Sequence, residues 1–262
     1  MASAVRKLDV IDTAARFTEA DAAALNARFA DVDTIGMLRA VMGEGLAGRL
    51  AVVSSFGAES AVLLHLVAQV DPATAVVFLE TRKHFPETIA YRDELVARLG
   101  LTNLLIIEPD PARLAERDAS ELRWSYDPDG CCEIRKVEPL ARALAGFDAS
   151  ITGRKGFQSA TRAGLPRFEI DKSDSQGRLK INPLADWSKA DIEAYMAAAK
   201  LPAHPLVAEG YPSIGCSPCT SKVAPGEDPR SGRWKGWDKT ECGIHVPLTP
   251  EGELPPGYEP FL

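Results

Sequence analysis

The chain has 262 residues, 45% of them hydrophobic, and a formal net charge of −7. This length can bury one substantial core, and the acidic balance gives no overall attraction to nucleic acid or to an anionic membrane surface. No apolar signal region is visible, and no apolar run approaches the ~20 residues of a membrane span. We therefore expect a soluble cytoplasmic protein. In that compartment, paired cysteines more often bind metal or react than form disulfides.

Residues 1–48 are predicted to be helical and to serve packing alone. Thr18, with Asp21 three residues later, is a helix-capping pattern, and Asp33 or Thr34 can cap the next helix.

The first informative segment joins a strand to a helix. Leu50–Val53 is a short buried strand, and SAVLLHLVAQV after it has the length and apolar content of a helix. The junction, Ser54–Ser60, contains three serines and one glycine. Such junctions present N–H groups to an anion, usually a phosphate, although an ordinary tight turn is the alternative. Because this junction lacks both G-x-G-x-x-G and G-K-[ST], neither a Rossmann dinucleotide site nor a standard P-loop fits it.

Further strands are predicted at Thr74–Glu80, Asn103–Glu108 and Ala149–Thr152, each separated from the next by helical sequence. Strands that alternate with helices indicate an α/β fold with a doubly wound, mostly parallel sheet flanked by helices. Ligands of such sheets bind at the carboxyl ends of the strands. Ser54–Ser60 and Leu79–Thr81 both fall at those ends.

The loop after the Ala149–Thr152 strand is basic. It contains Arg154, Lys155, Arg162 and Arg167 and no acidic residue, which favours an anionic ligand, although a merely solvated loop is equally compatible.

The chain then loses its regular patterning. FEID and LKINPL are predicted to form a hairpin, Ser188 caps one more helix, and the sequence beyond Pro202 has no periodicity. We expect an N-terminal helical segment (1–48), an α/β domain (49–210) and an irregular C-terminal segment (211–262).

Four of the five cysteines form two pairs. Cys131 and Cys132 are adjacent at the start of a predicted helix, and Cys216 and Cys219 form a C-x-x-C turn. A four-cysteine zinc site usually has two C-x₂₋₄-C turns, whereas an iron–sulfur cluster accepts irregular spacing. Successive helical side chains diverge by about 100°, which suits separate corners of a cluster. The spacing favours a cluster and leaves zinc open.

The fifth cysteine, Cys242, stands apart. Lys239 and His245 lie three residues to either side, and in a helical turn both cations would favour the thiolate, while Glu241 would oppose it modestly. A reactive cysteine and an inert one are both compatible with this pattern.

Several motifs occur in one order from about Ser54 to His245: SSFGAES, FLET, FPET, CCEIRK, ITGR, KINPLADW, YPSIGCSPCT and KTECGIH. With them the chain resembles the assimilatory adenylylsulfate (APS) reductases of the phospho-/adenylylsulfate reductase family. The resemblance implies an adenine-nucleotide alpha-hydrolase-like fold. It also implies reduction of APS to sulfite and AMP in sulfate assimilation, with reduced thioredoxin or a glutaredoxin-like protein as electron donor. A homo-oligomer is left open.

The resemblance assigns roles residue by residue. It makes Cys242 the nucleophile that forms an S-sulfonate, and it makes Cys131, Cys132, Cys216 and Cys219 the ligands of one 4Fe–4S cluster. The residues it places around the substrate are Ser54, Ser55, Gly57, Glu59, Leu79, Thr81, Lys136, Gly153, Arg162, Arg230, Arg233 and His245. Lys136 would link the cluster to the substrate.

The sequence departs from the family pattern at two places. Arg82 replaces a glycine of L-D-T-G, and the Pro-rich tail after His245 has no counterpart. The alternatives are a phosphoadenylylsulfate (PAPS) reductase or dual-specificity enzyme, a nucleotide-adenylating enzyme with a four-cysteine zinc site, and a cluster-based redox sensor. The adenylating class would want S-G-G-x-D-S where this chain has SSFGAES.

Overall fold

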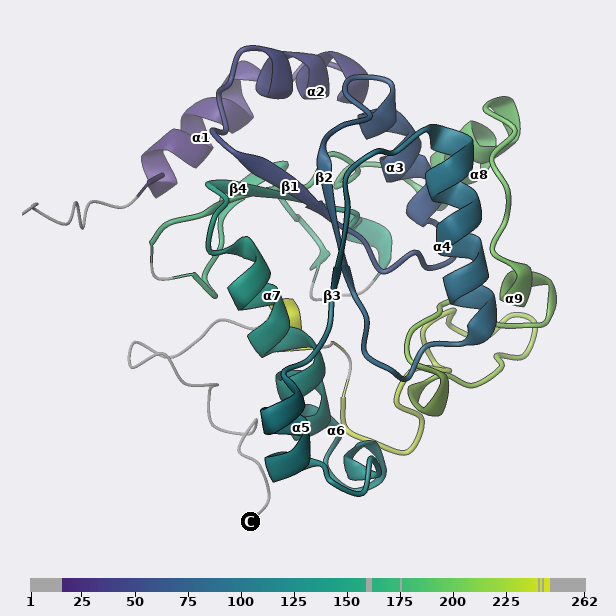
Figure 1. Ribbon diagram of the computed structural model, residues 1–262. Helices are drawn as coiled ribbons and strands as arrows, with labels where there is room; N and C mark the ends of the chain where they lie inside the picture. Colours follow the sequence, from purple (N-terminus) through teal and green to yellow (C-terminus); the bar gives the residue numbers. More distant parts are fainter. Residues whose placement is uncertain (1–15, 159–161, 175, 240, 242, 246–262) are drawn as a thin grey trace, which may run out of the picture.

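The computed structural model describes residues 16–158, 162–174, 176–239, 241 and 243–245 (Figure 1). Its strands are Leu50–Val53 (β1), Ala75–Leu79 (β2), Leu104–Ile107 (β3), Ala149–Thr152 (β4), Phe168–Ile170 (β5) and Leu179–Ile181 (β6). They form one sheet in the order β3-β2-β1-β4-β6-β5. All pairings are parallel except the antiparallel β5–β6 hairpin. The predicted mostly parallel sheet and its hairpin are confirmed.

The strand order reverses between β1 and β4, which are direct neighbours at the centre of the sheet. Strands β2 and β3 follow β1 in the sequence and lie on one side of it in the sheet. Strand β4 then pairs with β1 on its other side. Loops on either side of such a reversal diverge, so a crevice opens beyond the carboxyl ends of the two strands.

Helices cover both faces of the sheet. The larger core lies under α1 (Glu19–Arg28), α2 (Thr34–Gly43), α3 (Ser60–Ala68), α4 (Pro86–Leu99) and α8 (Lys189–Ala198). A smaller core lies under α7 (Glu138–Leu144), which Figure 1 shows on the opposite side of the strands from α3 and α4. Along β2, Val76 and Phe78 enter the larger core while Ala75, Val77 and Leu79 enter the smaller one. This alternation explains why the strand reads as a continuous apolar run.

The predicted helix caps are present. Thr18 and Ser188 each form a capping box, at α1 and α8 respectively, and Asp33 caps α2 by accepting a hydrogen bond from a backbone N–H at 2.7 Å. Gly100 ends α4 with φ +66°, a left-handed conformation that glycine adopts without steric cost.

The helix that carries Cys131 differs from the prediction. It begins three residues earlier, as α6 (Pro128–Cys132), and continues through a π-helical turn at Glu133–Val137 into α7. Asp127 caps its start by accepting from a backbone N–H at 2.8 Å. Pro139 has no N–H to donate to the preceding turn, so the regular α pattern is interrupted near the π turn.

Two short helices were not predicted: α5 (Pro111–Arg117) and α9 (Pro205–Ala208). Each begins with a proline behind a side chain that caps it, Asp110 for α5 and His204 for α9. Beyond α9, the helical turns of the described chain are short 3₁₀ segments, as expected for an irregular C-terminal segment. In the part of the chain that the structure describes, no helix has both the length and the apolar character required to span a bilayer.

Candidate active site

A cavity of about 680 Å³ opens at the carboxyl ends of β1, β2 and β4, beside the reversal of strand order. Loops that follow these three strands form one wall, and the C-terminal segment from Pro212 to Ile244 supplies the other. Seven Lys and Arg residues line this cavity against four acidic ones, although the protein as a whole is acidic. This local excess of positive charge suits an anionic ligand.

The loop after β1 leads directly into α3. Ser54 accepts a hydrogen bond from the N–H of Phe56 at 3.2 Å, and Phe56 takes the left-handed conformation with φ +49°. Gly57 lies close to the C-terminal segment, since a Cβ at this position would be 3.4 Å from the carbonyl oxygen of Ile214. The Ser54–Ser60 loop therefore faces the cavity at the start of a helix, where N–H groups remain available to an anion.

The end of β2 supplies Leu79 and Thr81. His84 donates from Nε2 to the carbonyl oxygen of Leu79 at 2.9 Å, and burial lowers the pKa of this histidine. The carbonyl oxygen of Thr81 accepts from buried Arg135 at 3.3 Å, and Arg135 pairs with Asp118 at 2.5 Å. These contacts hold the strand end against the helix that bears the cysteines.

The basic loop after β4 is largely neutralised by acidic partners. Lys155, which is buried, pairs with Glu59 at 2.9 Å. Arg154 pairs with Glu169, and burial lowers the pKa of its guanidinium to about 10. Arg167 does not line the cavity, because its guanidinium pairs with Asp186 at 2.6 Å and caps carbonyl groups near the end of α1. The predicted anion site therefore rests on fewer free cations than the loop contains.

A polar chain runs along the cavity wall from this loop to the C-terminal segment. Glu59 accepts from the amide of Gln158 at 3.1 Å, and the amide oxygen of Gln158 accepts from Arg162 at 2.5 Å. Arg162 in turn donates to Glu241 at 2.8 Å, and Arg230 reaches the same carboxylate oxygen at 3.4 Å. Hydrogen bonds thus connect the loop after β1 to the C-terminal segment along the cavity wall.

Arg233 has different surroundings from Arg162 and Arg230. Its guanidinium lies over the ring of Trp234 at 4.4 Å, and its Nε is buried without a hydrogen-bond partner. Within the described residues it forms no ion pair with an acidic side chain. Gly215 makes room for it, because a Cβ there would collide with the guanidinium. Arg233 is therefore a cation at the cavity wall with capacity to bind an anion.

The four paired cysteines lie together next to this cavity. Cys131, Cys132, Cys216 and Cys219 line a second, smaller pocket, and three residues are shared between the two: Lys136, Cys216 and Trp234. Burial, reinforced by the neighbouring thiols, raises the pKa of Cys131 to about 12 and that of Cys219 to about 11. Such thiols stay protonated at neutral pH unless a metal group compensates their charge.

Four cysteines that line one pocket suit more than one kind of metal group. Among the described residues, no three His, Cys, Asp or Glu side chains are placed to hold a single metal ion. A zinc site would need its four ligands at about 2.3 Å from one point. A 4Fe–4S cluster binds each thiolate at a different iron, so a pocket lined by four cysteines is also a donor set that fits a cluster.

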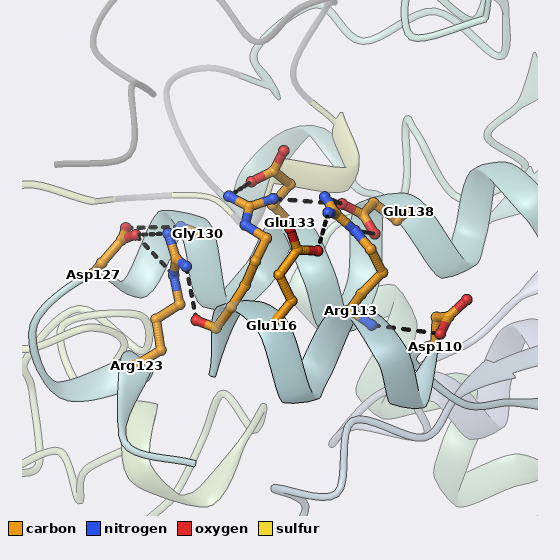
Figure 2. Close-up of polar contacts among 9 residues, drawn as sticks. Asp110, Arg113, Glu116, Arg123, Asp127, Gly130, Glu133 and Glu138 are labelled. Atoms are coloured by element: carbon orange, nitrogen blue, oxygen red, sulfur yellow. Dashed lines mark hydrogen bonds and ion pairs between the residues drawn. The ribbon is translucent and has the colours of Figure 1, made fainter. Parts of the chain in front are cut away.

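Ion pairs fix the helix that presents Cys131 and Cys132 (Figure 2). Arg117 of α5 pairs with Glu133 at 2.7 Å, at the first residue of the π turn, and Arg113 pairs with Glu138 at 2.9 Å, just after it. Arg123 pairs with Asp127, the N-cap residue of α6, at 2.5 Å. Because Lys136 lies inside the π turn, its position relative to Cys132 is not the simple one-turn relation expected from an α-helix.

The C-terminal segment is tied to the same helix. Lys239 forms an ion pair with Asp129 of α6 and lies over the ring of Trp234 at 5.5 Å. The charge of Lys239, expected from its spacing to favour the Cys242 thiolate, is thus shared with a carboxylate. Cys242 itself and the side chain of His245 lie outside the described residues.

The structure brings most of the predicted substrate-binding residues to one place. Those that line the cavity are Ser54, Ser55, Gly57, Glu59, Leu79, Thr81, Lys136, Gly153, Arg162, Arg230 and Arg233. Sequence reasoning did not assign Gln158, Phe157, Trp234 or Glu241 to the cavity, although all four line it. Gln158 lies in the predicted basic loop, and this location was the signal in the sequence that could have placed it at the cavity.

The fold and this cavity define a class of α/β proteins whose ligands bind at the reversal of a mostly parallel sheet. The family model described as "Phosphoadenosine phosphosulfate reductase domain" matches residues 49–222. The chain belongs to this family of phosphoadenosine phosphosulfate reductases.

Relatives and solved structures agree with that assignment. The chain is 50% identical to the adenosine 5'-phosphosulfate reductase of Mesorhizobium japonicum, over 92% of this chain and 93% of that protein. It is 46% identical to the phosphoadenosine 5'-phosphosulfate reductase of Gloeobacter violaceus, over 76% and 83% respectively. The crystal structure of phosphoadenylyl-sulfate reductase from Candida auris, in a phosphate complex, matches with a TM-score of 0.64 at 27% identity, covering 79% of this chain and 98% of that one.

Proposed function

We propose that the protein reduces APS to sulfite and AMP with reduced thioredoxin as electron donor. The observation that carries the proposal is one cationic cavity, at the reversal of the sheet, which shares a wall with a four-cysteine pocket. The names of the relatives from Mesorhizobium japonicum and Chelativorans sp., both adenosine 5'-phosphosulfate reductases, support it. We also propose a cytoplasmic location and the division into residues 1–48, 49–210 and 211–262.

The chemistry assigned to Cys242 is a displacement at sulfur. Its thiolate attacks the sulfur of the sulfate group, the bond from that sulfur to the bridging oxygen breaks, and AMP leaves with the electron pair. The product on the enzyme is a cysteine S-sulfonate. A thiolate of thioredoxin then attacks Sγ of Cys242 and expels sulfite, and the second thioredoxin thiol resolves the mixed disulfide. Thioredoxin is oxidised by two electrons, and sulfur(VI) becomes sulfur(IV).

The two ends of the cavity have different roles in this proposal. Ser54, Ser55, Gly57, Glu59, Leu79, Thr81 and Gly153 bind the nucleotide. Lys136, Arg162, Arg230, Arg233 and His245 face the phosphosulfate, where convergent cations stabilise the negative charge that builds on the leaving AMP. The position of Lys136 in the walls of both pockets supports its role beside the sulfate end.

The four paired cysteines are proposed to hold one 4Fe–4S cluster. When bound, the cluster would organise the sulfate end of the site without passing electrons. The chain's own part is to hold four thiols in a pocket braced by the Arg117–Glu133 and Arg135–Asp118 pairs.

The surroundings of three cations favour APS over PAPS. Arg82 and Lys83 are cations suited to a 3'-phosphate, but they pair with Glu108 at 2.5 Å and Glu121 at 2.9 Å, and neither is among the residues that line the large cavity. Arg154 forms an ion pair with Glu169. A PAPS reductase or dual-specificity enzyme is the second candidate, favoured by the name of the relative from Gloeobacter violaceus.

One assay tests the proposal: sulfite release from APS and, separately, from PAPS, each with reduced thioredoxin. We expect sulfite from APS and a kcat/KM that strongly favours APS. Equal or reversed values would support the second candidate. The absence of sulfite from both substrates, with intact metal content, would leave the redox-sensor alternative.

A further inference from the structure

Glu241 occupies the place where the proposed substrate would bring its negative charge. One carboxylate oxygen, Oε2, accepts from Arg162 at 2.8 Å and from Arg230 at 3.4 Å. All three side chains are largely buried, with 14% of Glu241, 11% of Arg162 and 20% of Arg230 exposed. All three also line the large cavity. These two arginines therefore already hold an anion, and that anion belongs to the chain itself.

Arg233 provides a contrast on the same wall. Within the described residues it pairs with no carboxylate, and its buried Nε lacks a hydrogen-bond partner. An incoming phosphosulfate can bind Arg233 without displacing a described carboxylate. It can bind Arg162 and Arg230 fully only when Glu241 releases them. The affinity for substrate is reduced by the free energy of that exchange.

We propose that Glu241 is an internal competitor for the phosphosulfate-binding arginines, displaced by substrate and restored when the product leaves. This inference rests on the proposed function. Held by the chain near its partners, the carboxylate acts at a high effective concentration. It excludes single inorganic anions such as sulfate or phosphate, while APS displaces it by adding the contacts of its nucleotide.

Glu241 also keeps the arginines in position when no substrate is bound. Arg154 lies close enough to Arg162 and Glu241 for both charges to influence its pKa. Without the carboxylate, cations gathered this closely would repel one another. The carboxylate thus keeps Arg162 directed into the cavity, where Gln158 also holds it at 2.5 Å. Glu241 is accordingly a positioning residue whose removal changes binding more than it changes the chemistry.

The test is equilibrium binding of APS, measured by calorimetry on holoenzyme that also carries Cys242→Ser, so that no adduct forms. We expect Glu241→Gln to bind APS about three- to tenfold more tightly, the range expected when two partly buried ion pairs no longer compete. Inorganic sulfate should compete with APS at a correspondingly lower concentration in the Glu241→Gln protein.

Glu227→Gln is the matched control. Glu227 also lines the cavity, but its carboxylate accepts from the backbone N–H of Ala224 and pairs with no arginine among the described residues. Its substitution removes the same charge and should leave APS and sulfate binding unchanged. A comparable gain in both variants would show a general charge effect and overturn the inference.

Two further outcomes are decisive. Unchanged or weaker APS binding by Glu241→Gln, alongside normal binding by the parent protein, would mean that Glu241 braces the arginines without competing, and the inference would be wrong. If neither the parent nor the variants bind APS or AMP, the proposed function itself fails. Iron content and the circular dichroism spectrum of each variant identify a folding defect.

Discussion

The hydroxyl of Thr81 lies 3.3 Å from the Sγ of Cys216 and joins the large cavity to the cysteine pocket. The same hydroxyl accepts from the N–H of Lys83, and the N–H of Ser217 donates to the carbonyl oxygen of Lys83 at 2.7 Å. The loop after β2 and the C-x-x-C turn are thus fixed to each other. A substitution at Thr81 would therefore affect both a ligand bound at the end of β2 and a metal group bound to Cys216.

Replacing Thr81 by valine should therefore disturb both sites, because valine has the same shape but lacks the hydroxyl. We expect a loss of about 10- to 100-fold in metal retention or turnover, typical of hydrogen bonds to metal ligands. Iron content, the visible spectrum and AMP affinity measure the two effects. Thr81→Ser keeps the hydroxyl and should stay close to the parent; equal losses in both variants would argue against a role for this hydrogen bond.

The metal content of the protein is the second prediction. Purified without oxygen, it should be brown and contain about four irons and four sulfides per chain, as a cubane with four thiolate ligands requires. Cys216→Ser should remove or destabilise the cluster. Colourless anaerobic protein with stoichiometric zinc and negligible iron would contradict the assignment, and would favour the adenylating class with a structural zinc site.

The third prediction concerns Cys242. Four cysteines lie in one pocket, so this thiol remains for reaction with the substrate. Incubation with APS and no reductant should add one SO₃ group to the peptide that contains Cys242, detected by mass spectrometry. Cys242→Ser should abolish the adduct and turnover while iron content and AMP binding stay intact. An adduct on another cysteine, or turnover by the serine variant, would refute the mechanism.

Arg82 provides a test of backbone strain. It replaces a glycine of the family pattern and retains the left-handed conformation, with φ +59°, that costs non-glycine residues roughly 1 kcal/mol. Arg82→Gly should therefore be more stable to unfolding than Arg82→Ala by about 1 kcal/mol. Both variants lose the exposed pair with Glu108, so that contact cancels in the comparison. Equal melting temperatures for the two would show that the backbone conformation costs little here.

The buried side chain of His204 should make the free energy of unfolding depend on pH. Its side chain is buried, its Nδ1 accepts from the N–H of Leu206 at 3.2 Å, and its Nε2 meets the hydroxyl of Thr88 at 3.1 Å. Burial lowers its pKa from 6.5 to about 4, opposed in part by the charge of Glu87. Because the unfolded chain binds the proton more readily, stability is fully present above pH 6.5 and declines as the pH falls towards 4.

The loss attributable to His204 is on the order of 3 kcal/mol at full protonation. His204→Asn can keep the helix cap but does not titrate. Denaturant unfolding at pH values from 7 to 4 should therefore show a shallower decline for the asparagine variant than for the parent. Parallel declines would mean that other groups dominate acid unfolding.

The order of strands and helices could be predicted from the sequence because each depends on local patterns. Leu50–Val53 and Ala149–Thr152 are short apolar runs, and Thr18, Ser188 and Gly100 are caps whose effect reaches only one helical turn. The π turn after Cys132 was not predicted, because it reflects Pro139 together with ion pairs from α5, which lies elsewhere in the sequence.

The candidate site, like the fold, could be predicted from the sequence only in part. Eleven of the residues that line the cavity were identified from motifs, but the ion pairs of the charged ones were not, because these depend on partners distant in sequence. The sequence indicated four cations in the basic loop, yet tertiary contacts pair Lys155 with Glu59 and turn Arg167 to Asp186. Likewise, Glu241 was expected to act on its neighbour Cys242. Only folding brings it to Arg162, 79 residues away in the chain, because the C-terminal segment closes the second wall of the cavity.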